Sequence, residues 1–221
     1  MTVSSAAERR KGIRGRITRA AELAKRNPGD VQLIAVSKGR SSEEIEALIE
    51  AGQCDFGENR VQETLAKWPA LLARYPEIRL HAIGRLQSNK AADAVKLFDT
   101  IHSVDRRSLL QALVKEAEKA SRAPQVYIQV NIGEEEQKGG CSIGDIGQLV
   151  EAVRNWPLPL AGLMAIPPLG VEAAPYFALL AKLARRHDVT GLSIGMSSDF
   201  EAAVMLGATA VRVGTALFED E

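Results

Sequence analysis

Short β-branched segments and amphipathic helical segments alternate along most of this sequence. The eight strand candidates read VQLIAVSK, CDFGEN, RLHAIG, TIHSVD, QVYIQVN, LAGLMAI, GLSIGM and AVRVGTALF. Seven helical patterns lie between them, at residues 41–52, 60–75, 88–98, 107–121, 143–156, 172–187 and 198–206. This alternation is typical of a parallel sheet, and eight units predict an α/β fold, a single-domain (β/α)8 barrel of the TIM type. A doubly wound open sheet is the alternative, but no GxGxxG motif follows the first strand.

The first 30 residues add a further helical segment. Ile13, Ile17, Ala20 and Ala24 fall on one helical face, and the Asn-Pro-Gly sequence at residues 27–29 ends the pattern. The segment is rich in arginine and contains serine, so a transit peptide is the alternative. The periodicity favours a helix that belongs to the fold. We therefore expect one domain over residues 1–221, with the N-terminal helix in 1–30 and the barrel in 31–218.

Composition excludes several classes of partner. The 221 residues carry a formal net charge of zero, which gives no general attraction to nucleic acid or to an anionic membrane. No apolar run is long enough to cross a membrane. Cys54 and Cys141 are far apart, and neither they nor His81 and His102 show the spacing of metal ligands. We expect a cytoplasmic monomer with reduced thiols and no metal site.

Lys38 ends the first strand candidate, and two interpretations are open. On the strand alone, a solvated surface lysine is the simpler one, because exposed lysines are common. In a barrel, Lys38 follows Ile34 and Val36 on one side of its strand and lies at the carboxyl end, where active sites of barrels are found. An ammonium group buried under a helix would be costly, so the barrel mouth is the better placement. A lysine amine in the mouth can act as a nucleophile toward a carbonyl group.

A second feature lies near the other end of the sequence. Ser197 and Ser198 follow the seventh strand candidate, and Gly214 and Thr215 follow Arg-Val in the eighth. In barrels, the loops after these strands often bind phosphate through backbone N–H groups. An N-cap and a turn glycine are the alternative interpretation. The first and last strands are neighbours in a closed barrel, so a phosphorylated aldehyde such as pyridoxal 5′-phosphate (PLP) would satisfy both features.

Several motifs together resemble one family, the pyridoxal phosphate homeostasis proteins. They are AVSKGRS, DFGENRVQE, HAIGRLQSNK, IHSVDR, YIQVNIGEEEQKGG, LAGLMAIPP and LSIGMSSDFEAAVMLGATAVRVGTALF, and they cover residues 31–218. These single-domain PLP-binding proteins are similar to the N-terminal barrel of alanine racemase. The resemblance implies an imine-forming lysine at Lys38, a cofactor neighbour at Asn59, phosphate contacts from Ser197, Ser198, Gly214 and Thr215, and Arg212 facing the pyridine nitrogen.

The sequence departs from the family pattern at two positions. The family commonly has an aromatic residue where this chain has Ala82, and Arg85 fills a variable position. Neither change touches the anchor lysine, and both are expected to alter the mouth.

Arg212 also bears on the chemistry. A guanidinium is a permanent cation without an acceptor, so it disfavours a protonated pyridine nitrogen and weakens the electron sink that transamination needs. Racemases of this fold resemble the chain at this position, so Arg212 argues against transamination more than against racemisation. A structural salt bridge with Glu58 or Asp199 is the alternative interpretation.

Three functional classes remain: a PLP carrier or regulator, an amino-acid racemase, and an aldolase-type barrel that acts on a sugar phosphate. A racemase needs acid or base groups on both faces of its substrate, and racemases of this fold take the second, a tyrosine, from an additional domain of a partner subunit. The sequence stops at Glu221, just after the last strand candidate, and Tyr75, Tyr127 and Tyr176 fall in predicted helices or mid-strand. We predict a non-catalytic protein that carries, buffers or regulates PLP, with weak racemase-like activity as the alternative.

Apo PLP-dependent enzymes are the expected acceptors of the cofactor. Two further lysines remain ambiguous. Lys90 lies at a helix start, where polar residues often act as caps. Lys138, in a loop, could bind an aldehyde transiently, although a solvated surface lysine is the simpler interpretation.

Overall fold

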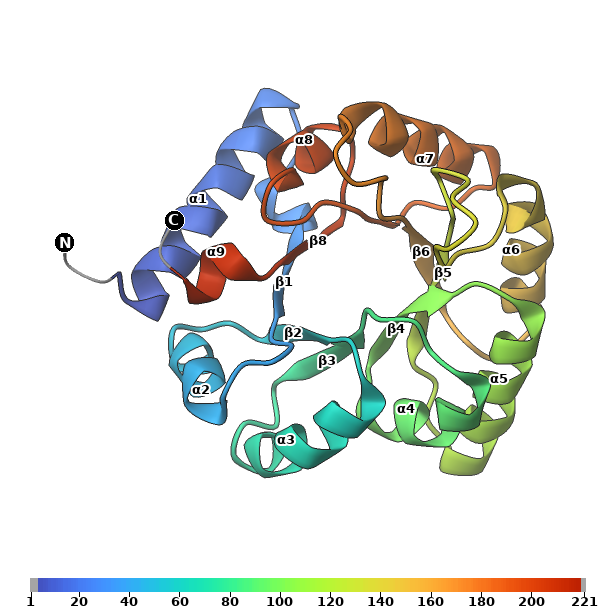
Figure 1. Ribbon diagram of the computed structural model, residues 1–221, viewed down its shortest axis with the longest axis horizontal. Coiled ribbons are helices and arrows are strands. Elements are labelled where there is room, and N and C mark those ends of the chain that lie inside the picture. The colour runs from blue at the N-terminus through green and yellow to red at the C-terminus, as the bar shows by residue number, and fades with distance from the viewer. Residues whose placement is uncertain (1–3, 220–221) are drawn as a thin grey trace.

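The structure, a computed structural model, describes residues 4–219 and confirms the predicted barrel. Within this range eight parallel strands close into a barrel in the order β1 to β8, with β1 paired to both β2 and β8, and helices form the outer ring (Figure 1). Residues 1–3 and 220–221 lie outside the described residues, as do the expected domain limits 1 and 221. None of the helices in residues 4–219 has the length and apolar character needed to cross a membrane.

The strands are short, with two to five residues each. They are β1 Gln32–Val36, β2 Asp55–Glu58, β3 Arg79–Ala82, β4 Thr100–Val104, β5 Gln125–Gln129, β6 Leu160–Met164, β7 Leu192–Ser193 and β8 Ala210–Val213. The helices are α1 Ala6–Leu23, α2 Ser42–Glu50, α3 Val61–Arg74, α4 Ala91–Leu97, α5 Arg107–Ala120, α6 Ile146–Arg154, α7 Ala174–Arg186, α8 Phe200–Met205 and α9 Thr215–Phe218. Single 3₁₀ turns at Pro28–Asp30, Ser88–Lys90 and Ile143–Asp145 precede β1, α4 and α6. Each predicted helix is therefore present within a few residues of its expected bounds.

Two strand predictions near the end of the chain were too long. The segment Thr215–Phe218 is not a continuation of β8 but a short helix, which starts after Gly214 and buries Ala216, Leu217 and Phe218. The seventh strand is reduced to Leu192–Ser193, because Gly195 takes a φ of +93°, a left-handed conformation that breaks the strand. Both corrections open loops at the carboxyl end of the barrel.

Helix α1 belongs to the fold, as the periodicity predicts. A capping box between Ser5 and Glu8 starts it, and Ile13, Ile17 and Ala20 are buried. Ala24 differs from the prediction, because it is the half-buried C-cap residue. The helix packs against α8 and α9 beside the point where β8 meets β1 (Figure 1).

The first strand separates two packed regions. Leu33 and Ala35 join the apolar core between the barrel and its helices, whereas Ile34 is fully buried outside that cluster. A Cβ atom added to Gly57 would lie 3.1 Å from Ile34 Cγ2, so Ile34 faces the barrel interior. This is the alternation predicted for the strand that leads to Lys38.

Candidate functional site

A cavity of about 310 Å³ opens at the carboxyl ends of β1, β7 and β8. Six of the seven predicted site residues line it, together with Val36, Arg40 and Met196: Lys38, Ser197, Ser198, Arg212, Gly214 and Thr215. The residues come from opposite ends of the sequence and meet because β1 pairs with β8. Asn59 is not among them.

Lys38 lies in a tight turn directly after β1, which we call the Lys38 turn (residues 37–40). The backbone N–H of Arg40 donates to the Ser37 carbonyl oxygen at 3.1 Å, and Gly39 takes a φ of +68°. A capping box between Ser41 and Glu44 then starts α2. The Lys38 side chain is exposed, and it takes part in none of the ion pairs of residues 4–219. Its amine is therefore free to react with a ligand in the cavity.

The Lys38 turn is tied to the barrel by a buried carboxylate. Glu58, at the end of β2, is fully buried, and its Oε1 accepts hydrogen bonds from Ser37 Oγ at 2.8 Å and Trp68 Nε1 at 2.9 Å. Lys67 Nζ lies 2.7 Å from the same oxygen and donates to the Ser37 carbonyl oxygen at 2.9 Å. The ion pair between Lys67 and Glu58 therefore holds the backbone immediately before Lys38.

A second carboxylate, that of Glu63 in α3, holds the other side of the Lys38 turn. Glu63 Oε1 accepts the backbone N–H of Gly39 at 2.8 Å. Sequence reasoning did not find Glu58, Glu63 or Lys67 as supporting residues. The only available signal was that Glu63 and Lys67 are four residues apart on a predicted helix.

The loops after β7 and β8 present backbone donors to the cavity. Gly214 N–H donates to Ser197 Oγ at 3.2 Å, which ties the two loops together. Asp199 Oδ1 accepts the Met196 N–H at 2.6 Å and shapes the first loop. Within residues 4–219, no group accepts a hydrogen bond from the backbone N–H of Ser198 or Thr215. Such free donors suit an anionic group.

Arg212 is buried beneath the cavity, with only 4% of its surface exposed. Its Nη1 donates to the Ser193 carbonyl oxygen at 2.7 Å and to Ser193 Oγ, and its Nη2 donates to the Ala165 carbonyl oxygen at 3.1 Å. Burial lowers the pKa of Arg212 to about 10, so the side chain stays charged at neutral pH. The predicted alternative, a salt bridge with Glu58 or Asp199, is wrong: none of the ion pairs found among residues 4–219 involves Arg212.

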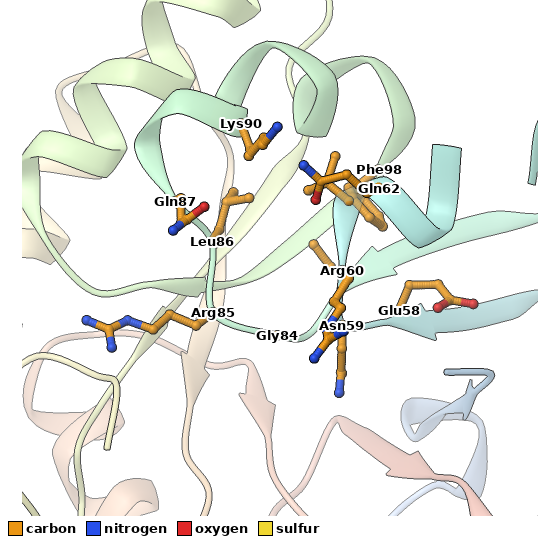
Figure 2. A pocket seen from close by; sticks show the side chains of 12 residues that line it. Glu58, Asn59, Arg60, Gln62, Gly84, Arg85, Leu86, Gln87, Lys90 and Phe98 are labelled. Carbon is orange, nitrogen blue, oxygen red and sulfur yellow. The ribbon is translucent and has the colours of Figure 1, made fainter. Parts of the chain in front are cut away.

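Asn59 follows β2 and lines a neighbouring cavity at the ends of β2 and β3 (Figure 2). Gly84 packs closely there, since a Cβ atom at this position would lie 2.3 Å from the Asn59 carbonyl oxygen. Lys90, Arg85 and Ala82 line the same cavity, and Ala82 is buried. In Figure 2 the Glu58 carboxylate points away from Lys90. A contact between Asn59 and the cofactor stays a prediction.

Lys138 and the two cysteines lie outside the cavity that holds Lys38. Lys138 lies 2.6 Å from Glu135 Oε2 and donates to the Pro167 carbonyl oxygen at 3.2 Å. Both cysteines are free, and burial raises the pKa of the Cys141 thiol to about 12. No group of three potential metal ligands occurs in residues 4–219.

The cavity therefore combines a free amine, free backbone donors and a buried cation. An amine can bond covalently to an aldehyde, backbone N–H groups can hold a phosphate, and a guanidinium can donate to an aromatic nitrogen. These residues fit PLP on their own chemistry. The arrangement also leaves Lys38 accessible from solvent.

Comparisons with known proteins point to the same cofactor. A profile of the family described as alanine racemase, N-terminal domain, matches residues 11–221. The pyridoxal phosphate homeostasis protein of Pseudomonas aeruginosa is 41% identical over 222 residues, covering 98% of this chain and 96% of the relative. The structure of PipY from Synechococcus elongatus with PLP bound matches with a TM-score of 0.79 and 40% identity, covering 92% of this chain and 99% of PipY. Alanine racemase from Clostridium difficile shares the fold alone, with a TM-score of 0.70 at 15% identity over 94% of this chain and 55% of the racemase.

Proposed function

This chain belongs to the pyridoxal phosphate homeostasis protein family, and we propose that it binds PLP covalently through Lys38 and carries, buffers or regulates it without catalysis. The observation that carries this proposal is the cavity that joins Lys38, the free N–H groups of Ser198 and Thr215, and buried Arg212. Apo PLP-dependent enzymes are the acceptors that we expect. The cytoplasmic location and the monomeric state stay predictions.

Each side chain has a defined role in this proposal. Lys38 Nζ adds to the aldehyde carbon, and one water molecule leaves as the imine forms; water reverses the reaction on release. The free N–H groups of Ser198 and Thr215 hold the phosphate, and the hydrogen bond from Gly214 to Ser197 fixes the two loops around it. PLP would supply the aldehyde that reacts with Lys38 and a ring that accepts electrons. Arg212 limits the second property, because a cation beside the ring nitrogen opposes its protonation.

The phosphate donors should dominate the affinity for the cofactor. Pyridoxal, which lacks the phosphate, should bind more weakly than PLP by on the order of 100-fold, because several hydrogen bonds to a charged group are lost. Replacing Ser198 with proline removes one backbone donor and should weaken PLP binding while leaving the affinity for pyridoxal unchanged. Equilibrium titration of both ligands provides the measurement. Equal affinity of the native chain for pyridoxal and PLP would remove the phosphate site from the proposal.

A carrier and an enzyme differ in what the loaded protein does to amino acids. Holo protein incubated with L-alanine or L-serine should show little racemisation and no transamination, because Arg212 opposes the protonated ring. Tyr127, one of the three tyrosines, is also enclosed in β5, where it stacks on His102. Arg212→Glu should favour the protonated ring yet still give poor turnover. Chiral chromatography of the amino-acid pool measures the outcome.

Rapid racemisation of the amino acids would contradict the carrier function. Racemisation by the unmodified protein at about 1 per second or faster, lost in Lys38→Ala, would make it an enzyme.

A complementary assay mixes holo protein with an apo PLP enzyme, with and without a trap for free PLP. Reactivation that persists with the trap supports direct hand-over, whereas reactivation abolished by the trap supports buffering.

A further inference from the structure

The barrel interior contains a line of polar side chains where compact barrels usually pack apolar layers. Asp55, His81, His102, Ser193 and Arg212 come from five different strands, and each is at most 7% exposed. Buried polar groups are stable only when they are hydrogen-bonded, so the partners of these five residues define what the line does.

The hydrogen bonds run without a break from Arg212 to Asp55. Ser193 Oγ lies within hydrogen-bond distance of Arg212 Nη1 and 2.9 Å from His102 Nδ1. His102 Nε2 lies 3.0 Å from His81 Nδ1, and His81 Nε2 lies 3.1 Å from Asp55 Oδ1. The line starts at the cavity that holds Lys38 and ends at the opposite end of the barrel, where Asp55 lines a second cavity.

The two ends constrain the bonds between them, and a single proton on each imidazole ring then fixes the direction of every bond. A guanidinium only donates and a carboxylate only accepts. Burial alone would raise the pKa of Asp55, but hydrogen bonds from His81 and Arg79 outweigh it and lower that pKa, so Asp55 is ionised at neutral pH. Burial lowers the pKa of His102, which keeps its ring neutral.

When each ring carries one proton, one arrangement of protons satisfies the whole line. Ser193 Oγ accepts from Arg212 and donates to His102 Nδ1, so the His102 proton is on Nε2 and points at His81 Nδ1. The His81 proton is then also on Nε2 and points at Asp55. Each group turns its lone pair toward Arg212, and the aligned dipoles stabilise a cation that has no carboxylate partner among residues 4–219.

We propose that Ser193, His102, His81 and Asp55 are positioning residues, forming a directional hydrogen-bond relay that orients Arg212 toward the cofactor ring. Three N–H donors of Arg212 are held by Ser193 and Ala165, which leaves the other two for a ligand in the cavity. The role of the relay rests on the proposed function, because it assumes that Arg212 faces PLP. The direction of the relay is a property of the protein without ligand.

The first arm of the test reads the relay in the apo protein. The sequence contains three histidines, so a long-range ¹H–¹⁵N spectrum resolves His81 and His102 from His187 with single substitutions for assignment. The relay requires that each of these two rings carries a single proton, on Nε2, at pH 7.5. A proton on Nδ1 of either ring, or on both nitrogens of one ring, would overturn the relay. This result does not depend on whether the protein binds PLP.

The second arm compares two buried serines. Ser193→Ala removes the link between Arg212 and His102, and it should weaken PLP binding by about tenfold, equivalent to about 1.4 kcal/mol. Ser103→Ala is the matched control, since Ser103 is 1% exposed and its Oγ has no hydrogen-bond partner among residues 4–219. It should change the affinity less than twofold. If the unmodified protein binds PLP and both variants bind it equally well, the positioning role is wrong; if the unmodified protein fails to bind PLP, the proposed function is wrong instead.

Discussion

Lys38→Ala should abolish covalent binding of PLP while leaving the barrel folded. The native holo protein should absorb as an imine, and borohydride should reduce the bond to a stable amine that mass spectrometry places on Lys38. The alanine variant should lose essentially all of this band and of the adduct, because Lys38 supplies the only amine that lines the cavity among residues 4–219. The Lys38 side chain is exposed and unpaired in that range, so its removal should cost little stability.

Lys138→Ala provides the matched control for this experiment. Lys138 is a loop lysine that pairs with Glu135, and its removal should leave both the band and the adduct on Lys38 intact. A Lys38→Ala protein that folds normally and keeps the full band would show that the assignment of the anchor is wrong. Weak labelling of Lys138 or Lys90 alone would identify secondary sites.

Lys67→Met should destabilise the fold by about 3–5 kcal/mol, because it leaves the carboxylate of Glu58 buried without its cation. Glu58 is fully buried, and its Oε2 already lacks a partner among the described residues. For a chain of this length the melting temperature should fall by roughly 10 °C. Thermal unfolding monitored by circular dichroism measures the effect.

The control is the same substitution, lysine to methionine, in an ion pair at the protein surface. Lys119→Met removes a cation whose side chain is 58% exposed and pairs with Glu116, so it should change stability by less than about 1 kcal/mol. The double variant Lys67→Met/Glu58→Gln should recover part of the loss, because Gln keeps an acceptor for Ser37 and Trp68 without a charge. A single Lys67→Met variant as stable as Lys119→Met would rule out the ion pair as the tie that holds the Lys38 turn.

The barrel was predictable because its signal is local and repeated. Each helix needs only its own apolar face and each strand only a short β-branched run, so errors at one element do not disturb the others. The segment Thr215–Phe218 shows the limit of this reasoning. Its Thr, Leu and Phe suit a strand by propensity, but after Gly214 the chain turns and buries Ala216, Leu217 and Phe218 as a helix against α1.

The cavity was predictable where its residues lie at the ends of neighbouring strands. Lys38, Arg212 and Gly214 meet because β1 and β8 pair, which follows from closing the barrel. The supports of the site were not predictable in the same way. Glu58 and Lys67 meet only through the packing of α3 on β2, and the sequence contains other charged residues at comparable spacing.

The relay shows a second reason why sequence reasoning falls short. The sequence shows only that His81 and His102 lack the spacing of metal ligands, and it gives no sign that they contact each other. Their contacts depend on how far each strand is shifted along the barrel, and strand sequences carry no direct record of that shift. The irregular register between β4 and β5 illustrates such a shift.

Closure between β1 and β8 makes the cofactor site a test of complete folding. Lys38 follows the first strand of the barrel and Gly214 follows the last, so a partly folded chain offers an amine without phosphate donors. Contacts between such distant segments form late, because a long loop must be closed before they stabilise anything. Retention of PLP would thus report an intact barrel. Bound PLP would in turn stabilise the folded barrel against separation of β1 from β8.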